Sequence, residues 1–150
     1  DVQHGMGYVL FERGAYHEAI EHFLETIRID PKHANALNYL GYTYAELGQH
    51  LDEAERLIKR ALTYTPDDGY ITDSLGWVHY KKGNYHQALT YLKKAVELVP
   101  EDPIILEHLG DVYLKLGDRE NALKYYRLSL EKENKDKEKI ETKIRQLTES

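Results

Sequence analysis

Apolar residues recur along most of the chain at intervals of three and four, the spacing that puts side chains on one face of an α-helix. Leu37, Leu40 and Tyr44 share such a face, and the same spacing returns over 106–113. No segment shows the apolar–polar alternation of a β-strand. The pattern therefore predicts an all-α protein with helices near residues 1–13, 16–29, 33–47, 52–64, 69–81, 84–98, 103–115 and 118–132.

The predicted helices belong to a repeat of 34 or 35 residues with four landmarks. The landmarks are a Met–Gly or Leu–Gly pair, a second glycine, an alanine and a proline. The pairs begin at Met6, Leu40, Leu75 and Leu109, and the second glycines are Gly14, Gly48, Gly83 and Gly117. The alanines are Ala19, Ala54, Ala88 and Ala122. The prolines are Pro31, Pro66 and Pro100, and Asn134 occupies the fourth proline position. Each unit is thus predicted to contain a first helix (helix A), a turn with a glycine, a second helix (helix B) and a loop marked by the proline.

Two details of the repeat carry structural predictions. One additional residue between Gly48 and Ala54 explains the single longer spacing in that turn. Gly41 and its equivalents lie inside helix A, where glycine costs about 1 kcal/mol relative to alanine. Because this glycine recurs in all four units, we expect helices A and B to approach closely there.

These motifs support a family resemblance. The second unit combines Leu40-Gly41-x-x-Tyr44 with Gly48, Ala54, Ile58, Ala61 and Pro66, and the third combines Leu75-Gly76 with Gly83, Tyr85, Ala88, Leu92, Ala95 and Pro100. This set resembles the tetratricopeptide repeat. The resemblance implies a right-handed superhelical solenoid of antiparallel helix pairs, with units at about 1–33, 34–68, 69–102 and 103–134. The style of the repeats is similar to bacterial multi-repeat proteins, which occur in the cytoplasm or the periplasm, so the compartment stays unknown.

The two ends of the repeat array lead to different expectations. Ile140, Ile144 and Leu147 form a narrow apolar stripe, which predicts a capping helix over 135–150. At the other end the first helix begins at Asp1 with no capping segment. We therefore expect the chain to be the C-terminal fragment of a longer protein, and the exposed edge of the first repeat to be able to pair with a second copy.

Composition narrows the classes of partner. Twenty Lys and Arg against 26 Asp and Glu give a net charge of −6, which disfavours binding to nucleic acid. No apolar run is long enough to insert in a membrane, and there is no Cys for disulfides or thiolate chemistry. Thirteen Tyr beside two Phe favour a surface that is both apolar and hydrogen-bonding.

The resemblance implies that the side of helix A facing away from helix B lines a concave groove for partner segments. On this mapping the groove residues are His4, Tyr8, Phe11, Asn35, Asn38, Tyr39, Tyr42, Tyr70, Asp73, Ser74, Trp77, Tyr80, Lys81, Glu107, His108 and Asp111, with Lys115 at the edge. Exposed aromatic residues are typical of interaction hot spots, and Trp77 is expected to be one of them. The alternative is that these aromatic side chains pack between neighbouring repeats.

The groove composition predicts the chemistry of the partner. In the family, a carboxylate clamp of Lys, Arg and Asn holds C-terminal carboxylates, whereas His4, Tyr8, Tyr39, Tyr70 and Ser74 occupy the corresponding positions here. We therefore expect a protein or peptide partner with apolar or aromatic anchors and a basic residue, rather than an acidic tail.

Catalytic interpretations find little support. His17 and His22 lie five residues apart, about 140° around a helix, so they are poorly placed to bind one zinc ion. Gly5-Met6-Gly7 follows no predicted strand, as a dinucleotide-binding motif would require. We expect no catalytic residue, metal or cofactor, and interpret the chain as a non-catalytic interaction scaffold. Two alternatives stay open: a recruiting domain of a larger enzyme, such as an O-linked N-acetylglucosamine transferase, and a scaffold that self-assembles through repeat edges.

Overall fold

The computed structural model describes residues 2–132 and 135–149, and within these ranges the chain forms helices and no strand. The helices are α1 (Val2–Glu12), α2 (Tyr16–Ile29), α3 (Ala34–Leu47), α4 (Leu51–Tyr64), α5 (Gly69–Lys82), α6 (Tyr85–Leu98), α7 (Pro103–Lys115), α8 (Arg119–Glu131) and α9 (Lys137–Thr148). The prediction of an all-α fold is confirmed, and the first eight helices begin and end within one residue of their predicted bounds. Asn134, the substitute for the fourth proline, lies outside the described residues.

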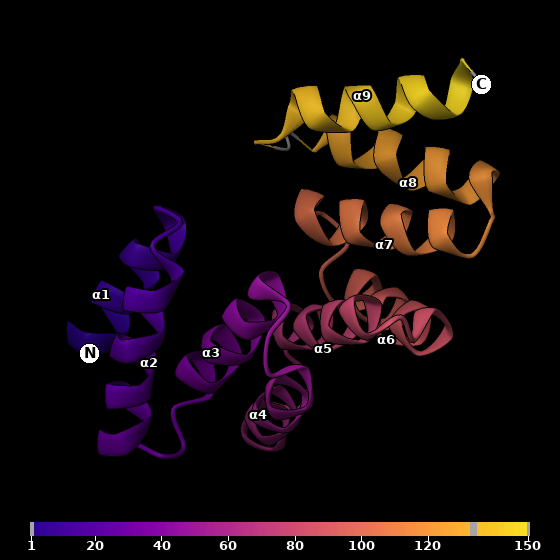
Figure 1. Ribbon diagram of the computed structural model, residues 1–150. Coiled ribbons are helices and arrows are strands. Elements are labelled where there is room, and N and C mark those ends of the chain that lie inside the picture. Colours follow the sequence, from indigo (N-terminus) through magenta and orange to yellow (C-terminus); the bar gives the residue numbers. More distant parts are fainter. Residues whose placement is uncertain (1, 133–134, 150) are drawn as a thin grey trace.

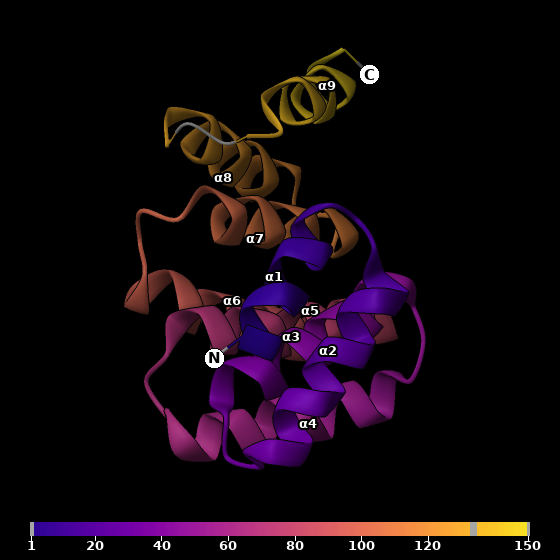
Figure 2. The ribbon, with the colours of Figure 1, turned by 90° about the vertical axis from the view of Figure 1, so that its left-hand side faces the viewer.

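The helices form an all-α solenoid of stacked pairs. Helices α1 and α2, α3 and α4, α5 and α6, and α7 and α8 pack as pairs, and the second helix of each pair contacts the first helix of the next. Figure 1 shows the pairs following one another, with the N-terminus at one end of the stack and α9 at the other. Figure 2, turned by 90°, shows α7, α8 and α9 as successive layers at that end.

Small residues allow the close approach of the two helices in a pair. A Cβ added to Gly41 of α3 would lie 2.6 Å from Cγ1 of Ile58 in α4. The facing Ala54 and Ala61 are fully buried. The glycine inside helix A is therefore explained by contact with helix B, as the repeat pattern predicted.

The one-residue insertion is accommodated in the turn before α4. Gly48 ends α3 with a φ of 66°, and His50 before α4 has a φ of 52°. Such a left-handed conformation costs a non-glycine residue on the order of 1 kcal/mol. The longer turn still delivers Ala54 into the same buried position as the corresponding alanines of the other repeats.

Helix α9 packs on the last repeat. Ile140 is fully buried, and Ile144 and Leu147 are partly buried against a core that includes Tyr126 of α8. Lys143 extends from α9 to Glu107 and Asp111 of α7, so charged as well as apolar contacts hold this helix in place. None of the helices in the described ranges is both long and apolar enough to cross a bilayer.

Candidate binding groove

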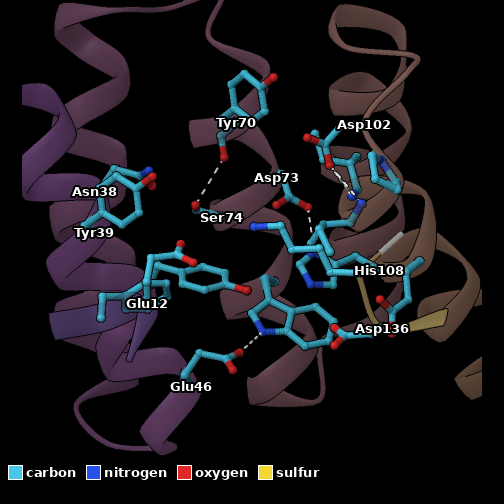
Figure 3. Close-up of a pocket in the computed structure, with 18 of the residues that line it drawn as sticks. Glu12, Asn38, Tyr39, Glu46, Tyr70, Asp73, Ser74, Asp102, His108 and Asp136 are labelled. Carbon is cyan, nitrogen blue, oxygen red and sulfur yellow. Dashed lines mark hydrogen bonds and ion pairs between the residues drawn. The ribbon is translucent and has the colours of Figure 1, made fainter. Parts of the chain in front are cut away.

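A cavity of about 750 Å³ opens between the first helices of the four repeats and the start of α9. Helices α1, α3, α5 and α7 supply most of its walls. Twelve of the sixteen predicted groove residues line it: Tyr8, Phe11, Asn38, Tyr39, Tyr42, Tyr70, Asp73, Ser74, Trp77, Glu107, His108 and Asp111. Figure 3 shows Glu12, Asn38 and Glu46 on one side of this space, with Asp102, His108 and Asp136 on the other.

The other four predicted residues lie away from the cavity lining. His4 packs at the junction of α1, α2 and α3, with its ring centroid 4.7 Å from that of His33. Burial, and secondarily the neighbouring His33, lower the pKa of His4 below its usual 6.5. Asn35 is exposed at the start of α3, and Tyr80 packs on Trp77. Lys81 is exposed, with its ammonium group 5.4 Å from the centroid of the Trp77 ring.

The expectation that Trp77 is an exposed anchor is wrong, because its side chain is only 8% exposed. Its ring stacks on His108 of the next repeat, with a centroid distance of 3.9 Å and an interplanar angle of 17°. Its Nε1 donates a hydrogen bond of 2.6 Å to Oε1 of Glu46 in the preceding repeat. Trp77 therefore joins three repeats, which is the inter-repeat packing left open as an alternative.

The predicted acidic residues of the groove are also buried, and all three have partners. Asp73 accepts a hydrogen bond of 2.9 Å from Nδ1 of His108. The ammonium group of Lys143 lies 3.0 Å from Glu107 and 2.8 Å from Asp111. Burial of His108 opposes its positive charge, but Asp73 and then the carboxylates of α7 outweigh this effect and raise the pKa of His108 above 6.5. Charge in this half of the groove is therefore largely balanced within the protein.

The exposed aromatic surface lies elsewhere on the groove. Tyr8 of α1 is 41% exposed, and Tyr70 at the start of α5 is 55% exposed. Tyr8 and Phe11 pack against Tyr39 at centroid distances of 5.5 and 5.7 Å. Burial is the main cause that raises the pKa of Tyr39 to about 12, so its hydroxyl group stays neutral at physiological pH. A neutral tyrosine hydroxyl both donates and accepts hydrogen bonds, which suits a polar partner backbone.

The structure also adds residues that the sequence mapping missed. The additional lining residues are Glu12, Tyr16, Glu46, Asp102, Pro103, Ile104, Ile105, Lys135, Asp136 and Lys139. Glu12 and Glu46 were within reach of sequence reasoning, because they occupy the same repeat position as Lys81 and Lys115, six residues after the Met or Leu of each pair. Lys135, Asp136 and Lys139 enter through the docking of α9, which the repeat pattern does not encode.

A metal centre finds no support in the arrangement of side chains. Across the described part of the chain, no group of three or more His, Asp or Glu side chains is placed to hold a metal ion. The buried His108 is used in stacking on Trp77 and in its contact with Asp73.

Comparison with known families matches residues 7–48 and 76–117 to the TPR repeat, and residues 105–139 to a second tetratricopeptide repeat family. TPR repeat-containing protein PA4667 of Pseudomonas aeruginosa is 44% identical over 63 residues, which cover 42% of this chain and 11% of that protein. Superkiller protein 3 of Schizosaccharomyces pombe is 35% identical over 77 residues, covering 51% of this chain and 6% of that protein. The chain thus matches only about a tenth or less of the length of these relatives.

Solved structures share the fold at lower sequence identity. Pseudomonas aeruginosa pilF has a TM-score of 0.82 and 22% identity, covering 99% of this chain and 67% of that one. A structure of MamA from Desulfovibrio magneticus RS-1 has a TM-score of 0.71 and 22% identity, covering 87% and 73% of the two chains. Tetratricopeptide repeats typically serve as protein–protein interaction scaffolds and are generally non-catalytic. The matches to the repeat cover more than half of the sequence, and the chain belongs to the tetratricopeptide repeat family.

Proposed function

We propose that the chain is a non-catalytic scaffold whose groove binds an extended segment of a partner protein through apolar or aromatic anchors and a basic residue. The observation that carries this proposal is the cavity of about 750 Å³ that runs across all four repeats and is lined by aromatic and acidic side chains. Four repeats that contribute to one continuous surface fit an extended segment better than a compact small molecule. A micromolar affinity, about −8 kcal/mol, is expected for such a segment.

The anchoring surface is the set of tyrosines that remain accessible. Tyr8 and Tyr70 keep large exposed fractions although both line the cavity. Tyrosine combines a large apolar ring with a hydrogen-bonding tip, so it contributes strongly to interfaces when a partner covers it. Because Trp77 is covered by its own protein, it supports the shape of the groove instead of contacting the partner.

Selection of peptides from a phage-displayed library of random linear sequences tests this proposal. We expect sequences that bind the wild-type protein and lose affinity about tenfold or more for a Tyr8→Ala/Tyr70→Ala double variant. Tyr64→Ala is the matched control, since Tyr64 is 40% exposed on α4 and lies outside the cavity lining. Failure to select any peptide, or equal losses in the control, would overturn the groove as the binding surface.

A second candidate interface lies at the edge of α1. Met6 and Val9 are 48% and 46% exposed, whereas the corresponding Leu40 and Val78 of later repeats are buried by a preceding helix. The apolar edge of α1 is exposed, whereas the corresponding edge is covered in the later repeats. Such an edge is suited to pairing with another helix, including one from a second copy. Light scattering at high protein concentration should then give a mass above the monomer, and Met6→Ser/Val9→Ser should restore the monomer. A monomeric wild-type protein would contradict self-pairing.

A further inference from the structure

We propose that the α1–α3 half of the groove recognises a Lys or Arg side chain of the bound segment, with Glu12 and Glu46 as specificity-determining carboxylates and Asn38 as the acceptor of a partner N–H. This inference rests on the proposed function, because it assigns the partner's basic residue to one half of the same groove. The two halves differ in whether their carboxylates already have cationic partners.

In the half formed by α5, α7 and α9, the protein supplies its own cations. His108 contacts Asp73 at 2.9 Å. Lys143 lies within 3.0 Å of carboxylate oxygens of both Glu107 and Asp111. A partner cation placed there would have to displace the buried His108 or the half-buried Lys143 from its carboxylates, which is unfavourable.

In the half formed by α1 and α3, the carboxylates are held by neutral donors. Glu46 accepts a hydrogen bond from the indole N–H of Trp77 at 2.6 Å. Glu12 is hydrogen-bonded to Tyr8. Within the described ranges, no Lys, Arg or His forms an ion pair with Glu12 or Glu46. These two carboxylates, exposed at Glu12 and half-buried at Glu46, are therefore available to a cation from outside. Hydrogen bonds between ionised groups are stronger than those between neutral groups.

Asn38 provides an independent sign of a missing hydrogen-bond donor. Its side chain is 6% exposed and lines the cavity, and within the described structure its buried Oδ1 accepts no hydrogen bond. Leaving a buried acceptor unpaired costs about 1–3 kcal/mol. In the proposed complex the amide of Asn38 turns its oxygen toward the cavity and accepts an N–H of the bound segment, which offsets this cost. Asn38, Tyr42 and Glu46 follow one another at intervals of four residues, so they form a column of about 12 Å along one face of α3.

The surroundings of this column suit a cationic side chain. Phe11 and Tyr42 pack at a centroid distance of 5.6 Å beside it, and aromatic rings attract Lys and Arg. Burial, followed by nearby Glu46 and Asp73, raises the pKa of Tyr42 well above 10, so this hydroxyl group adds no negative charge. Subsites rich in acceptors favour donor-rich groups, and guanidinium and ammonium groups carry donors without any acceptor.

The charge found at one repeat position also differs between the two halves of the groove. Glu12 and Glu46 hold a position that Lys81 and Lys115 occupy in the third and fourth repeats. The same repeat position is therefore acidic in the first two units and basic in the last two. A basic residue of the partner is attracted to the carboxylates of the first half, whereas Asp73, Glu107 and Asp111 of the second half already have cationic partners within the protein. This difference fixes the direction in which the segment lies.

Peptides selected from the random phage-displayed library provide the probe. Each would be synthesised with its basic residue intact and with that residue replaced by a neutral analogue, citrulline for Arg or Nε-acetyl-lysine for Lys. Affinities would be measured for the wild-type protein and for Glu12→Gln/Glu46→Gln, in which the new amide oxygen on α3 can still accept the hydrogen bond from Trp77. The matched control is Glu97→Gln/Glu131→Gln, which makes the same change in net charge at exposed positions outside the cavity lining.

We expect the neutral analogue to bind the wild-type protein and the control variant about tenfold or more weakly, and to bind Glu12→Gln/Glu46→Gln as well as the basic peptide does. An equal loss in all three proteins would overturn the assignment of the cation to Glu12 and Glu46. Selected peptides that depend on Tyr8 and Tyr70 but contain no required basic residue would overturn this inference and leave the proposed function intact. Absence of any groove-dependent peptide would instead remove the proposed function itself.

Discussion

The two halves of the groove place the same kinds of side chain in different surroundings. In the α5–α7 half, Trp77 is covered by its neighbours and Asp73 is paired with His108. In the α1–α3 half, Tyr8 remains exposed and Glu46 has only a neutral donor. The comparison shows that a groove position alone does not decide whether an aromatic or acidic side chain stays accessible, because contacts from the neighbouring repeats cover some of these side chains and not others.

The largest difference between the halves is expected in stability. Trp77→Ala removes a ring that joins three repeats and should lower the free energy of unfolding by about 3–5 kcal/mol. Tyr8→Ala should lower it by less than about 1 kcal/mol, because much of that ring is already in water. Chemical denaturation followed by circular dichroism measures both values. Similar losses for the two variants would remove the distinction between a structural and an exposed half.

A smaller effect is expected from the cation that α9 contributes. Lys143→Ala removes the ammonium group that contacts Glu107 and Asp111, and should lower the free energy of unfolding by about 2–3 kcal/mol. Lys139→Ala is the matched control on the same helix. Its side chain is 65% exposed and 4.0 Å from Glu107, so its loss should cost less than about 1 kcal/mol. Thermal denaturation at low and high salt would compare the stabilities of the two variants. Equal losses of stability would argue against the role of Lys143 in balancing the charge of Glu107 and Asp111.

Asn38 offers a way to separate stability from binding. Asn38→Leu replaces an unpaired polar group with an apolar one of similar size, so the free protein should be unchanged or more stable by up to about 1 kcal/mol. The same variant should bind the selected peptides more weakly, because a partner N–H loses its acceptor. Calorimetry of unfolding and peptide titrations test the two effects on one sample. A destabilised variant with unchanged affinity would show that Asn38 serves folding rather than binding.

The smallest expected effect is a dependence on pH in the paired half. The pKa of His108 is raised in the folded protein, where Asp73, Glu107 and Asp111 favour its charge and Lys143 neutralises two of these carboxylates. Protonation therefore favours folding. This contribution is complete below the unfolded pKa of about 6.5 and disappears as the pH rises through the folded-state value.

The difference in unfolding free energy between the wild-type protein and Asp73→Asn isolates this contribution. We expect the difference to be largest below about pH 6.5 and to shrink toward alkaline pH. The pKa values of His4 and His79 are lowered by burial, so these residues act in the opposite direction, but they are present in both proteins and cancel. A difference that grows with pH would contradict the raised pKa of His108.

The sequence predicted the repeat more fully than the groove. Helix bounds followed from glycine, alanine and apolar spacing, because each repeat is held mainly by contacts with its own partner helix and its neighbours. The burial of Trp77 was missed because it depends on His108, which lies in another repeat. Glu12 and Glu46 were recoverable from repeat position alone. The contact of Lys143 with Asp111 requires the docking angle of α9, which no local pattern specifies.

An NMR titration of the ¹⁵N-labelled protein with one selected peptide tests most directly whether the α1–α3 half of the groove binds the partner. We expect the largest amide shifts on α1 and α3, around Tyr8, Asn38 and Glu46, with smaller shifts at the start of α5. Helices α4, α6 and α8, which supply no side chain to the cavity lining, should change little. Shifts centred on α7 and α9, or on the outer helices, would contradict recognition by the α1–α3 half of the groove.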